Sequence, residues 1–395
     1  MNAPIRSLLL CSRPPWPPIG GDRLRTSQLA RVLAGLGPVH LVATGDDAAP
    51  ASHPFASVRL VRPSRASTAL GLVRGMARGR SLQESLYDTG EVRRAVAAAL
   101  AGGIDVVVAH LLRTVPWLPE AGPPVIVCLQ DALCAQAREA TSHGGGADWR
   151  RLALRFDRGR LEAAERRALG RADGVTFITA RDRDLVLAGA QVRHAVVPAA
   201  VVPAAVEHVR DEPAEPRPDS IVFAGNLRTA SNRDMALHLV HEVLPRVRRQ
   251  RPNATLDLVG VEAPPVVRAL DSEPGVRVVG RVQDMAATLA EAWVTACPLR
   301  FGSGVQNKVL ESFAAGTPVV GTARVAASLS ASPPSGLLVG ALDEPFAAQL
   351  VRVLGDRELR DRQGRAGIRF VREQHAFPTT FDPLVGLIRD VIRAR

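Results

Sequence analysis

The chain has 395 residues, about twice the length of a typical single domain, so two domains are expected. Hydrophobic residues make up 46% and charged residues 23%, which excludes wholesale disorder. No apolar run approaches the roughly 18 residues that a membrane span needs. The apolar run at residues 7–11 is also too short for a secretory signal. We therefore expect a soluble, cytoplasmic protein.

The net charge of +11 raises the question of an anionic partner. Lys308 is the only lysine among the 50 basic residues, and the arginines are spread along the chain rather than gathered in one block. This skew is typical of a G+C-rich genome and argues against a nucleic-acid partner. Peripheral contact with an anionic lipid at the inner membrane face, a phosphorylated substrate and no anionic partner at all stay open, as does the oligomeric state.

The first half of the chain alternates short apolar runs with helical stretches, which is typical of parallel sheets wound with helices. The expected strands are residues 7–11, 39–43, 58–61, 104–109, 125–129 and 175–178. The expected helices are residues 22–36, 90–101 and 148–169.

A proline-rich segment separates this half from the next. It contains Pro213, Pro216 and Pro218 and has no helical period, so it predicts a linker at 206–218. An N-terminal domain at 1–205 and a second domain at 219–375 follow from it. The second domain repeats the pattern, with strands at 221–224, 255–259, 276–279, 293–296 and from 319, and helices at 234–250, 306–315 and from 344 onward.

The sequence therefore predicts an α/β protein of two Rossmann-like, doubly wound domains that face one another. Ligands of such sheets bind at the carboxyl ends of the strands, so we expect a cleft between the domains there.

Three candidates follow strands of the first domain. Ser12–Arg23 contains Gly20 and Gly21, whose backbone lets a phosphate approach the following helix, although a rigid proline turn explains the loop equally well. His110 ends a predicted central strand and is expected to project into the cleft, but a purely structural histidine is as probable. Asp131 follows the next strand and either faces the same edge or caps a turn.

An Asp-x-Asp pattern at Asp182 and Asp184 raises the question of a metal site. It opens a predicted helix, where capping and the helix dipole explain the aspartates better. No cysteine or histidine grouping has metal-ligand spacing either, so no metal is expected.

The most informative segment is residues 296–320. Gly302 and Gly304 form a loop after a strand, and the backbone N–H groups of this loop and of the following helix make an anion cradle. Lys308 lies in the first turn of that helix, where the dipole disfavours a cation unless an anion is bound. Glu311, one turn further along the same face, has a carboxylate suited to two ribose hydroxyls. A phosphate site beside a diol acceptor predicts a nucleotide-sugar site; the alternative is an ordinary amphipathic helix.

This segment resembles a known family. Gly-Ser-Gly-x-x-x-Lys-x-Leu-Glu at 302–311, followed by Ala-Ala-Gly-Thr-Pro-Val-Val at 314–320, is similar to glycosyltransferase family 4, whose members are retaining nucleotide-sugar enzymes with the GT-B fold. Residues 12–23, 223–227 and 275–284 also resemble family segments, so the likeness covers nearly the whole chain. The version of the motif here looks like a branch associated with exopolysaccharide and cell-surface sugar transfer.

The resemblance implies a mechanism. It implies metal-free transfer with retention from a UDP-, GDP- or dTDP-sugar to a hydroxyl or amine acceptor, with no cofactor. Lys308 would bind the diphosphate, Glu311 the ribose and His110 the donor sugar, while Gly20 and Gly21 would lie against the diphosphate or the acceptor. A C-terminal helix at 376–395 would cross back to the first domain.

Two departures from the family pattern affect the donor site. Ser303 stands where most members have a first glutamate, so sugar contacts would come from the backbone of Ser303, Gly304, Val305, Gln306 and Asn307. The family's usual arginine after Gly225 is replaced by Asn226, and either Arg228 or Arg233 would complete the diphosphate clamp.

The acceptor side is the least determined by the sequence, and Arg13 and Asp131 are its expected residues. Two other functions stay open: a GT-B-fold epimerase or phosphorylase, and a non-catalytic basic binding protein.

Overall fold

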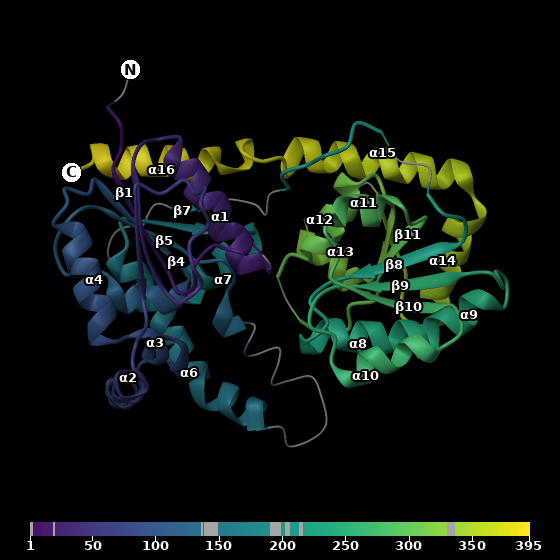
Figure 1. Ribbon diagram of the computed structural model, residues 1–395, viewed down its shortest axis with the longest axis horizontal. Helices are drawn as coiled ribbons and strands as arrows, with labels where there is room; N and C mark the ends of the chain where they lie inside the picture. Colours follow the sequence, from purple (N-terminus) through teal and green to yellow (C-terminus); the bar gives the residue numbers. More distant parts are fainter. Residues whose placement is uncertain are drawn as a thin grey trace. The chain divides into compact units, whose positions relative to one another are not determined.

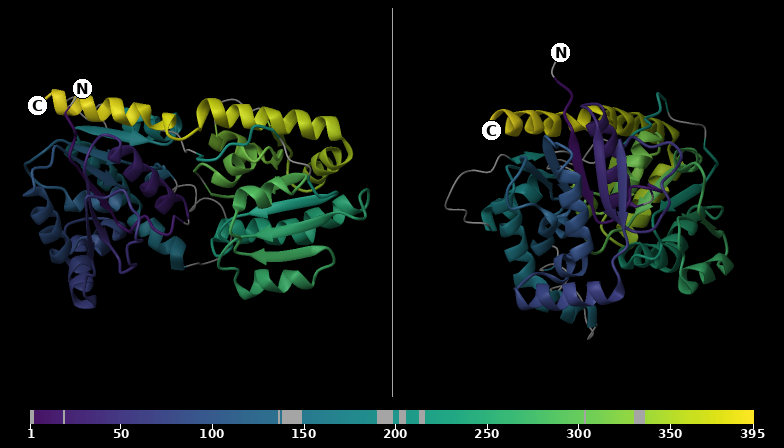
Figure 2. Two further views of the ribbon diagram at one scale, coloured as in Figure 1. Left: turned by 45° about the horizontal axis from the view of Figure 1, so that its top comes forward. Right: turned by 60° about the vertical axis from the view of Figure 1, so that its left-hand side comes forward.

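The chain divides into two compact units in a computed structural model (Figures 1 and 2). The first unit comprises Met1–Pro203 with Phe381–Arg395, and the second comprises Ala204–Thr380. The structure describes residues 3–18, 20–135, 137, 149–189, 199–201, 206–212, 216–302, 304–329 and 336–395. Within these residues, no helix is both long enough and apolar enough to cross a bilayer.

The described part of the first unit contains a seven-stranded parallel sheet in the order β3-β2-β1-β4-β5-β6-β7. Its strands are β1 (Ser7–Cys11), β2 (Val39–Thr44), β3 (Ser57–Val61), β4 (Val106–His110), β5 (Val125–Cys128), β6 (Gly174–Phe177) and β7 (Ala199–Val201). Its helices are α1 (Gly21–Ala34), α2 (Arg65–Ala77), α3 (Leu82–Tyr87), α4 (Gly90–Leu100), a 3₁₀ turn (Leu112–Trp117), α6 (Trp149–Arg171), α7 (Ala180–Gly189) and α16 (Asp382–Arg393).

The second unit has a six-stranded parallel sheet among its described residues, in the order β10-β9-β8-β11-β12-β13. Its strands are β8 (Ser220–Ala224), β9 (Thr255–Val259), β10 (Val276–Gly280), β11 (Val294–Cys297), β12 (Val319–Gly321) and β13 (Leu337–Val339). Its helices are α8 (Ala230–His238), a π-helical turn (Leu239–Val243), α9 (Leu244–Arg248), α10 (Pro265–Arg268), a 3₁₀ turn (Ala269–Ser272), α11 (Met285–Ala290), α12 (Asn307–Ala314), α13 (Ala323–Leu329), α14 (Glu344–Gly355), α15 (Arg357–Gln374) and a 3₁₀ turn (Thr379–Phe381) that runs into the first unit.

Both sheets share one topology, which fixes where a ligand can bind. In each, the first strand lies beside both the second and the fourth, so the chain winds outward in two directions from that pair. The two central strands are buried on both faces: all residues of β1 and of β8 are buried. The carboxyl ends of β1 and β4, and those of β8 and β11, are therefore the topological switch points where open α/β sheets bind ligands.

Most predicted strands are confirmed within a residue or two, but three features differ. The strand expected at 104–109 begins at Val106, and Asp105 before it forms two hydrogen bonds with the backbone of Arg6: its carboxylate accepts from the Arg6 N–H at 2.7 Å, and its own N–H donates to the Arg6 carbonyl at 2.8 Å. The helix expected at 234–250 begins at Ala230 and has a π-helical turn before Pro245, whose ring nitrogen cannot donate to the helix. The helices α2, α3, α10, α11 and α13 and the strands β7 and β13 were not predicted at all.

The proline-rich segment at 206–218 is tied to the second unit. The N–H of Val206 donates to the carbonyl of His375 at 2.7 Å, and the N–H of Arg217 donates to that of Glu291 at 2.8 Å. Residues 213–215 lie outside the described part of the chain, as does residue 148, where the long helix of the first half was expected to begin. The final helix, α16, packs against β6 and β7 and belongs to the first unit (Figure 1).

Candidate functional site

The switch point of the second unit brings two helix N-termini together. The helix α8 follows β8, and α12 follows β11, so both begin at the carboxyl edge of the sheet. The Nζ of Lys308, in the first turn of α12, donates a hydrogen bond to Oδ1 of Asn232, in the first turn of α8, at 2.5 Å. The partial positive charges of the two helix ends therefore converge near one ammonium group, an arrangement that favours an anion.

Lys308 is buried, with only 7% of its surface exposed. Its Nζ lies 4.9 Å from the centroid of the Phe223 ring, the last but one residue of β8. Burial lowers the pKa of Lys308 below its ordinary value of 10.5, and Cys297 and Glu311 oppose the shift. An ammonium group has three N–H donors, and Asn232 accepts from one of them, so this lysine retains capacity to bind an anion.

Glu311 lies one turn along α12 from Lys308 and is partly buried. Burial raises the pKa of its carboxyl above the ordinary 4.5, and Lys308 opposes this shift. Within the described residues, the carboxylate has no hydrogen bond and no salt bridge. It is thus a partly desolvated acceptor whose hydrogen-bonding capacity is unused, which is costly unless a ligand supplies donors.

Hydrogen bonds and packing against β11 and α15 fix the position of α12. The hydroxyl of Ser312 donates to the carbonyl of Lys308 at 2.7 Å. Because the Ser312 hydroxyl proton is used in this bond, its Oγ accepts from the hydroxyl of Thr295 on β11, whose Oγ1 lies 2.8 Å away. Phe313 is fully buried and faces Gly367 of α15, where an added Cβ would lie only 2.9 Å from the phenyl ring. The helix that carries Lys308 and Glu311 is consequently held rigidly on the sheet.

The glycine loop before α12 adopts the backbone that its sequence requires. Gly302 has φ 105° and Gly304 has φ 88°, both in the region that side-chain-bearing residues avoid. A Cβ on Gly302 would lie 3.7 Å from that of Ser231, so the loop passes beside the first turn of α8. Gln306 donates from Nε2 to the carbonyl of Gly304 at 3.2 Å. Val305 and Asn307 are partly buried, and Ser303 lies outside the described residues.

The turn after β8 organises the first turn of α8. The backbone carbonyl of Asn226 accepts from Nδ2 of Asn232 at 2.9 Å, and its side-chain oxygen accepts from the N–H of Arg228 at 3.0 Å. Gly225 lies so close to the Asn232 side chain that a Cβ added to this glycine would be 2.7 Å from Nδ2 of Asn232. Asn226 and Gly225 therefore hold Asn232 in place, and Asn232 in turn holds Lys308.

The two candidate clamp arginines differ in their surroundings. The side chain of Arg228 is 75% exposed and lies 3.7 Å from the carboxylate of Glu262. Arg233 is partly buried in α8, directly after Asn232, and forms no ion pair with any described residue. Arg233 therefore has the less exposed side chain of the two and no competing carboxylate among the described residues.

In the first unit, His110 lies at the switch point but is enclosed. It pairs with Cys11 across β1 and β4 and is 1% exposed. Its Nδ1 is 2.9 Å from Oγ1 of Thr26, and its Nε2 is 2.9 Å from Nε2 of Gln130. Because the Thr26 hydroxyl donates to the carbonyl of Asp22 at 2.8 Å, it must accept from the histidine. The proton is therefore on Nδ1, and Nε2 accepts from the Gln130 amide.

His110 is a neutral imidazole at physiological pH. Burial lowers its pKa to about 3, and the positive charges of Arg25 and Arg113 act in the same direction. Arg25 is itself buried beneath the ring of Phe381, at 4.2 Å from its centroid, and burial lowers its pKa to about 10. A group with so low a pKa is no general acid near pH 7. With both nitrogens bonded to protein groups, His110 reaches a ligand only if the Gln130 side chain moves.

Ion pairs to Asp22 lie at the end of the proline loop that precedes α1. Asp22, in the first turn of α1, lies 3.3 Å from Arg113 and 3.9 Å from Arg13. The Arg13 side chain is 54% exposed, so it remains accessible to a ligand. Gly20, with φ 90°, precedes α1, and Gly21 is the first residue of the helix.

The aspartates after β5 and β6 have structural partners. Asp182 lies in the first turn of α7. Its carboxylate accepts hydrogen bonds from the hydroxyl of Thr179 at 2.5 Å and from the backbone N–H of Ala132 at 3.2 Å. Asp184 lies 2.8 Å from Arg183. Asp131 is partly buried next to Gln130. The described residues contain no group of three potential metal ligands.

A surface cavity of about 310 Å³ lies elsewhere in the second unit. It is lined by residues at the amino ends of β11 and β12, including Trp293 and Pro318, and by Arg360 of α15, which stacks on Trp293 at 3.8 Å. Parallel sheets bind their ligands at the carboxyl ends of their strands, so we place the candidate site at the opposite edge, around Lys308.

The residues of these networks that were not predicted from the sequence include Asn232, Thr26 and Gln130. A usable signal existed for Gln130, which follows β5 immediately beside Asp131. Asn232 and Thr26 contact their partners across 76 and 84 residues of chain, and no local pattern reports such a contact.

Comparison with known proteins identifies the second unit. Residues 218–356 match the family described as "Glycosyl transferases group 1", and this range contains Asn232, Lys308 and Glu311. Residues 218–356 are a group 1 glycosyltransferase domain. No curated protein sequence matches the chain.

Solved structures resemble the whole chain. The sucrose-phosphate synthase of Thermosynechococcus elongatus has a TM-score of 0.69 at 16% identity, over 99% of this chain and 100% of its own. Anabaena HepE, solved with UDP and glucose, has a TM-score of 0.66 at 13% identity, over 98% of each chain. A glycosyltransferase from Rickettsia africae has a TM-score of 0.63 at 10% identity, over 99% of this chain and 100% of its own. These likenesses establish the two-domain GT-B fold that the sequence predicted.

Proposed function

We infer that this chain is a retaining glycosyltransferase that moves a sugar from a nucleotide-sugar donor to a hydroxyl or amine acceptor. The observation that carries this inference is the pairing of Lys308 with Asn232 between two helix N-termini, beside the carboxylate of Glu311. The match of residues 218–356 to group 1 glycosyltransferases supports the same assignment. We place the reaction in glycoconjugate, exopolysaccharide or natural-product biosynthesis.

The donor diphosphate is assigned to the N-termini of α8 and α12. There Lys308 and the partly buried Arg233 stabilise the negative charge that develops on the leaving diphosphate, which is the part that a metal plays in other transferases. We assign further phosphate contacts to the backbone of Gly302 and Gly304, which have positive φ angles and no side chains to block a ligand. We therefore propose transfer without a metal ion, with the leaving phosphate oxygen accepting the acceptor proton on the same face of the sugar.

The donor ribose is assigned to Glu311. A ribose presents two adjacent hydroxyl donors, and the two carboxylate oxygens of Glu311 have no other hydrogen-bond donors among the described residues. This pairing explains why a carboxylate remains at a position where burial disfavours its charge. UDP, the nucleotide bound in the HepE structure, is the first candidate, ahead of GDP and dTDP.

In the first unit, we assign the donor sugar to the pair of His110 and Gln130. The neutral His110 orients the Gln130 amide through its Nε2. Gln130 is the more exposed of the two and is the group that meets the sugar hydroxyls, or that moves to let His110 do so. Arg13 and Asp131 are proposed to contact the acceptor. We propose a cytoplasmic location with peripheral contact at the inner membrane face.

A ligand screen followed by an assay tests this function. UDP, GDP, ADP and dTDP are compared by thermal shift, because a ligand that binds only the folded state raises its stability with occupancy. Sugars linked to the best nucleotide are then incubated with the protein, and slow hydrolysis and the anomeric configuration of any product are followed by NMR. Failure of every nucleotide to shift the melting temperature, or a product with inverted configuration, contradicts the proposal.

A further inference from the structure

The helix α2 of the first unit presents its apolar side chains to solvent. On a helical projection, Ala66, Leu70, Val73 and Ala77 form one stripe, and all four are exposed. Leu70 is 48% exposed and Val73 is 66% exposed. A helix on the surface of a soluble domain normally turns such a stripe toward the core. In α2 this orientation is reversed.

Two glycines explain how α2 is held with its apolar side outward. Gly71 and Gly75 are the buried residues of the helix. An added Cβ would lie 2.6 Å from the carbonyl oxygen of Asp88 at Gly71, and 2.2 Å from Oγ of Ser85 at Gly75. The backbone of α2 therefore lies directly on α3, and no larger residue fits on its inner face. This attachment requires none of the exposed apolar side chains.

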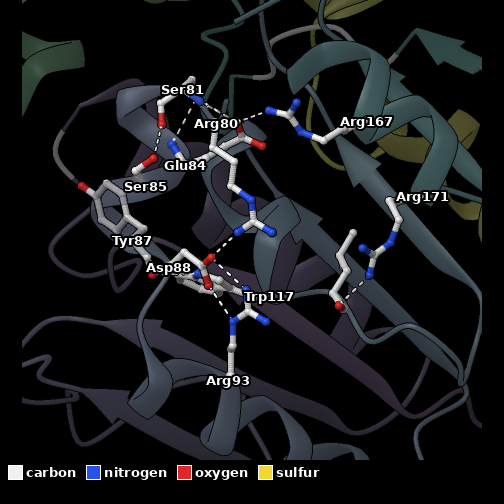
Figure 3. A network of polar contacts seen from close by, with 11 residues as sticks. Arg80, Ser81, Glu84, Ser85, Tyr87, Asp88, Arg93, Trp117, Arg167 and Arg171 are labelled. Carbon is white, nitrogen blue, oxygen red and sulfur yellow. Dashed lines mark hydrogen bonds and ion pairs between the residues drawn. The ribbon is translucent and has the colours of Figure 1, made fainter. Parts of the chain in front are cut away.

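The helix α3 provides a rigid base for α2 (Figure 3). Ser81 and Glu84 form a capping box at its N-terminus, and Arg167 of α6 lies 2.7 Å from the buried carboxylate of Glu84. At its C-terminus, the carboxylate of Asp88 pairs with Arg80 and Arg93. The helix on which α2 lies is thus held by ion pairs to two buried carboxylates rather than by a pliable loop.

The charged side chains of α2 and of the residue that follows it have a single sign. On the helical projection, Arg65 lies on one side of it and Arg74 and Arg78 on the other; all three are exposed, and none forms an ion pair with a described residue. The sequence contains no acidic residue from position 62 to position 83. An apolar strip with arginines on both flanks is the pattern of helices that lie in the interface of an anionic bilayer.

We propose that α2 docks the protein on an anionic lipid surface, with Leu70 and Val73 inserted among the acyl chains and Arg65, Arg74 and Arg78 at the headgroups. Thirteen residues make a helix of about 20 Å, which is too short to span a bilayer and suited to lie along it. Self-association through this face would bring the arginines of two copies together, and the Glu91 carboxylate beside α2 already accepts a hydrogen bond from the Ser67 hydroxyl at 2.5 Å. A nucleic acid would use the arginines but not the exposed Leu70 and Val73.

Co-sedimentation of the full chain with liposomes tests the proposal. We expect binding to vesicles that contain phosphatidylglycerol and little binding to pure phosphatidylcholine. Binding should weaken with salt, because ions screen surface charges beyond about 8 to 10 Å at physiological ionic strength. Arg74→Gln with Arg78→Gln should reduce partitioning by about 5-fold per arginine, since each basic residue near such a surface is worth about 1 kcal/mol.

Leu70→Ser with Val73→Ser should reduce partitioning on the order of 10-fold, because both side chains lose the transfer of their exposed area into lipid. The matched controls are Val266→Ser, at a valine 49% exposed in the second unit, and Arg365→Gln with Arg369→Gln on α15. These controls should bind as the wild type does. Thermal melts of every variant confirm that the fold is retained.

A site-specific probe gives a second readout. The four native cysteines are buried, so an environment-sensitive maleimide dye reacts selectively at Val73→Cys or at the control Val266→Cys. We expect a blue shift with anionic vesicles at residue 73 and none at residue 266. Absence of vesicle binding, equal binding of the α2 variants and the wild type, or a change of oligomeric state in the α2 variants would overturn the proposal. None of these readouts depends on transferase activity.

Discussion

Replacing Glu311 by glutamine separates a ligand-binding carboxylate from a structural one. Glutamine keeps the size and helix propensity of the side chain and removes only its charge. In the empty protein the pKa of Glu311 is raised by burial, so the folded state holds this proton more tightly than the unfolded state does. Stability from this group is therefore lost as the pH rises from the ordinary glutamate range through the raised pKa. At neutral pH we expect Glu311→Gln to melt at the same temperature as the wild type or higher.

The effect on binding has the opposite sign. A hydrogen bond from a ribose hydroxyl to a carboxylate is charge-assisted and worth about 1.5 to 3 kcal/mol. Loss of that charge should weaken the binding of the nucleotide by about 10- to 100-fold, at roughly 1.4 kcal/mol for each factor of ten in affinity. A variant that is as stable as the wild type or more so, and binds its ligand less well, is typical of a functional site residue.

Calorimetric titration and thermal denaturation measure the two effects. A nucleotide sugar is the better ligand for a pH series, because both of its phosphates are esterified and neither titrates near pH 6. Wild-type affinity should fall as the pH drops through the raised pKa of Glu311, whereas that of Glu311→Gln should not show this fall. The control is Glu373→Gln, at an exposed glutamate of α15.

Two outcomes would refute this reasoning. Unchanged affinity in a well-folded Glu311→Gln protein would remove the carboxylate from the donor site, and with it the assignment of the ribose. A clear loss of stability in the empty variant would show that Glu311 has a structural partner, contrary to the absence of one among the described residues.

Four further predictions concern the same machinery. Lys308→Met should weaken diphosphate-containing ligands by about 10- to 100-fold and leave a bare nucleoside unaffected; calorimetry that finds equal losses for both would place the lysine elsewhere. Asn232→Ala, which removes the acceptor of Lys308, should lower the free energy of unfolding by about 1 to 3 kcal/mol in urea titrations. His110 has its pKa lowered to about 3, so the folded state binds its proton less well and stability should fall by about 1.4 kcal/mol per unit as the pH drops from 6.5 toward 3; His110→Asn should lack this contribution, and equal slopes in the two proteins would contradict it. Transfer should continue in excess chelator, and activity that vanishes there and returns with magnesium or manganese would exclude the metal-free mechanism.

The sequence predicts the two sheets and the position of the donor site because both depend on local patterns. Apolar runs of four residues mark β1 and β8, and their order with the helices between them fixes which strand ends lie at the switch points. Lys308 stands out because no other lysine exists and because the first turn of a helix disfavours a cation. These signals all lie within about ten residues of the group that they identify.

The remainder of the site depends on contacts that no local pattern encodes. Asn232 is recognisable as the partner of Lys308 only when α8 and α12 are placed side by side. The direction of the hydrogen bonds through His110 depends on the Thr26 hydroxyl, which can be assigned only because it donates to the Asp22 carbonyl. The expectation that His110 projects freely toward a ligand could not take this enclosure into account.

The helix α2 was missed for a different reason. Gly71 and Gly75 lower its intrinsic helix propensity, and its apolar residues face away from the core, so neither propensity nor a buried stripe indicates a helix. Ser64 accepts a hydrogen bond from the N–H of Ser67 and caps its start. The same glycines that obscure the helix in the sequence allow it to lie on α3.

The candidate donor site contains two ionisable groups in surroundings that disfavour the charged form of each. Burial lowers the pKa of Lys308 and raises that of Glu311, and their mutual attraction opposes each shift. A bound diphosphate would favour the charged form of Lys308, and a bound ribose would favour the charged form of Glu311. Binding of the donor would thus offset the free energy that burial costs the charged form of each group. Because each part of the nucleotide stabilises one of the two charges, we expect a complete nucleotide to bind more tightly than its nucleoside and diphosphate fragments.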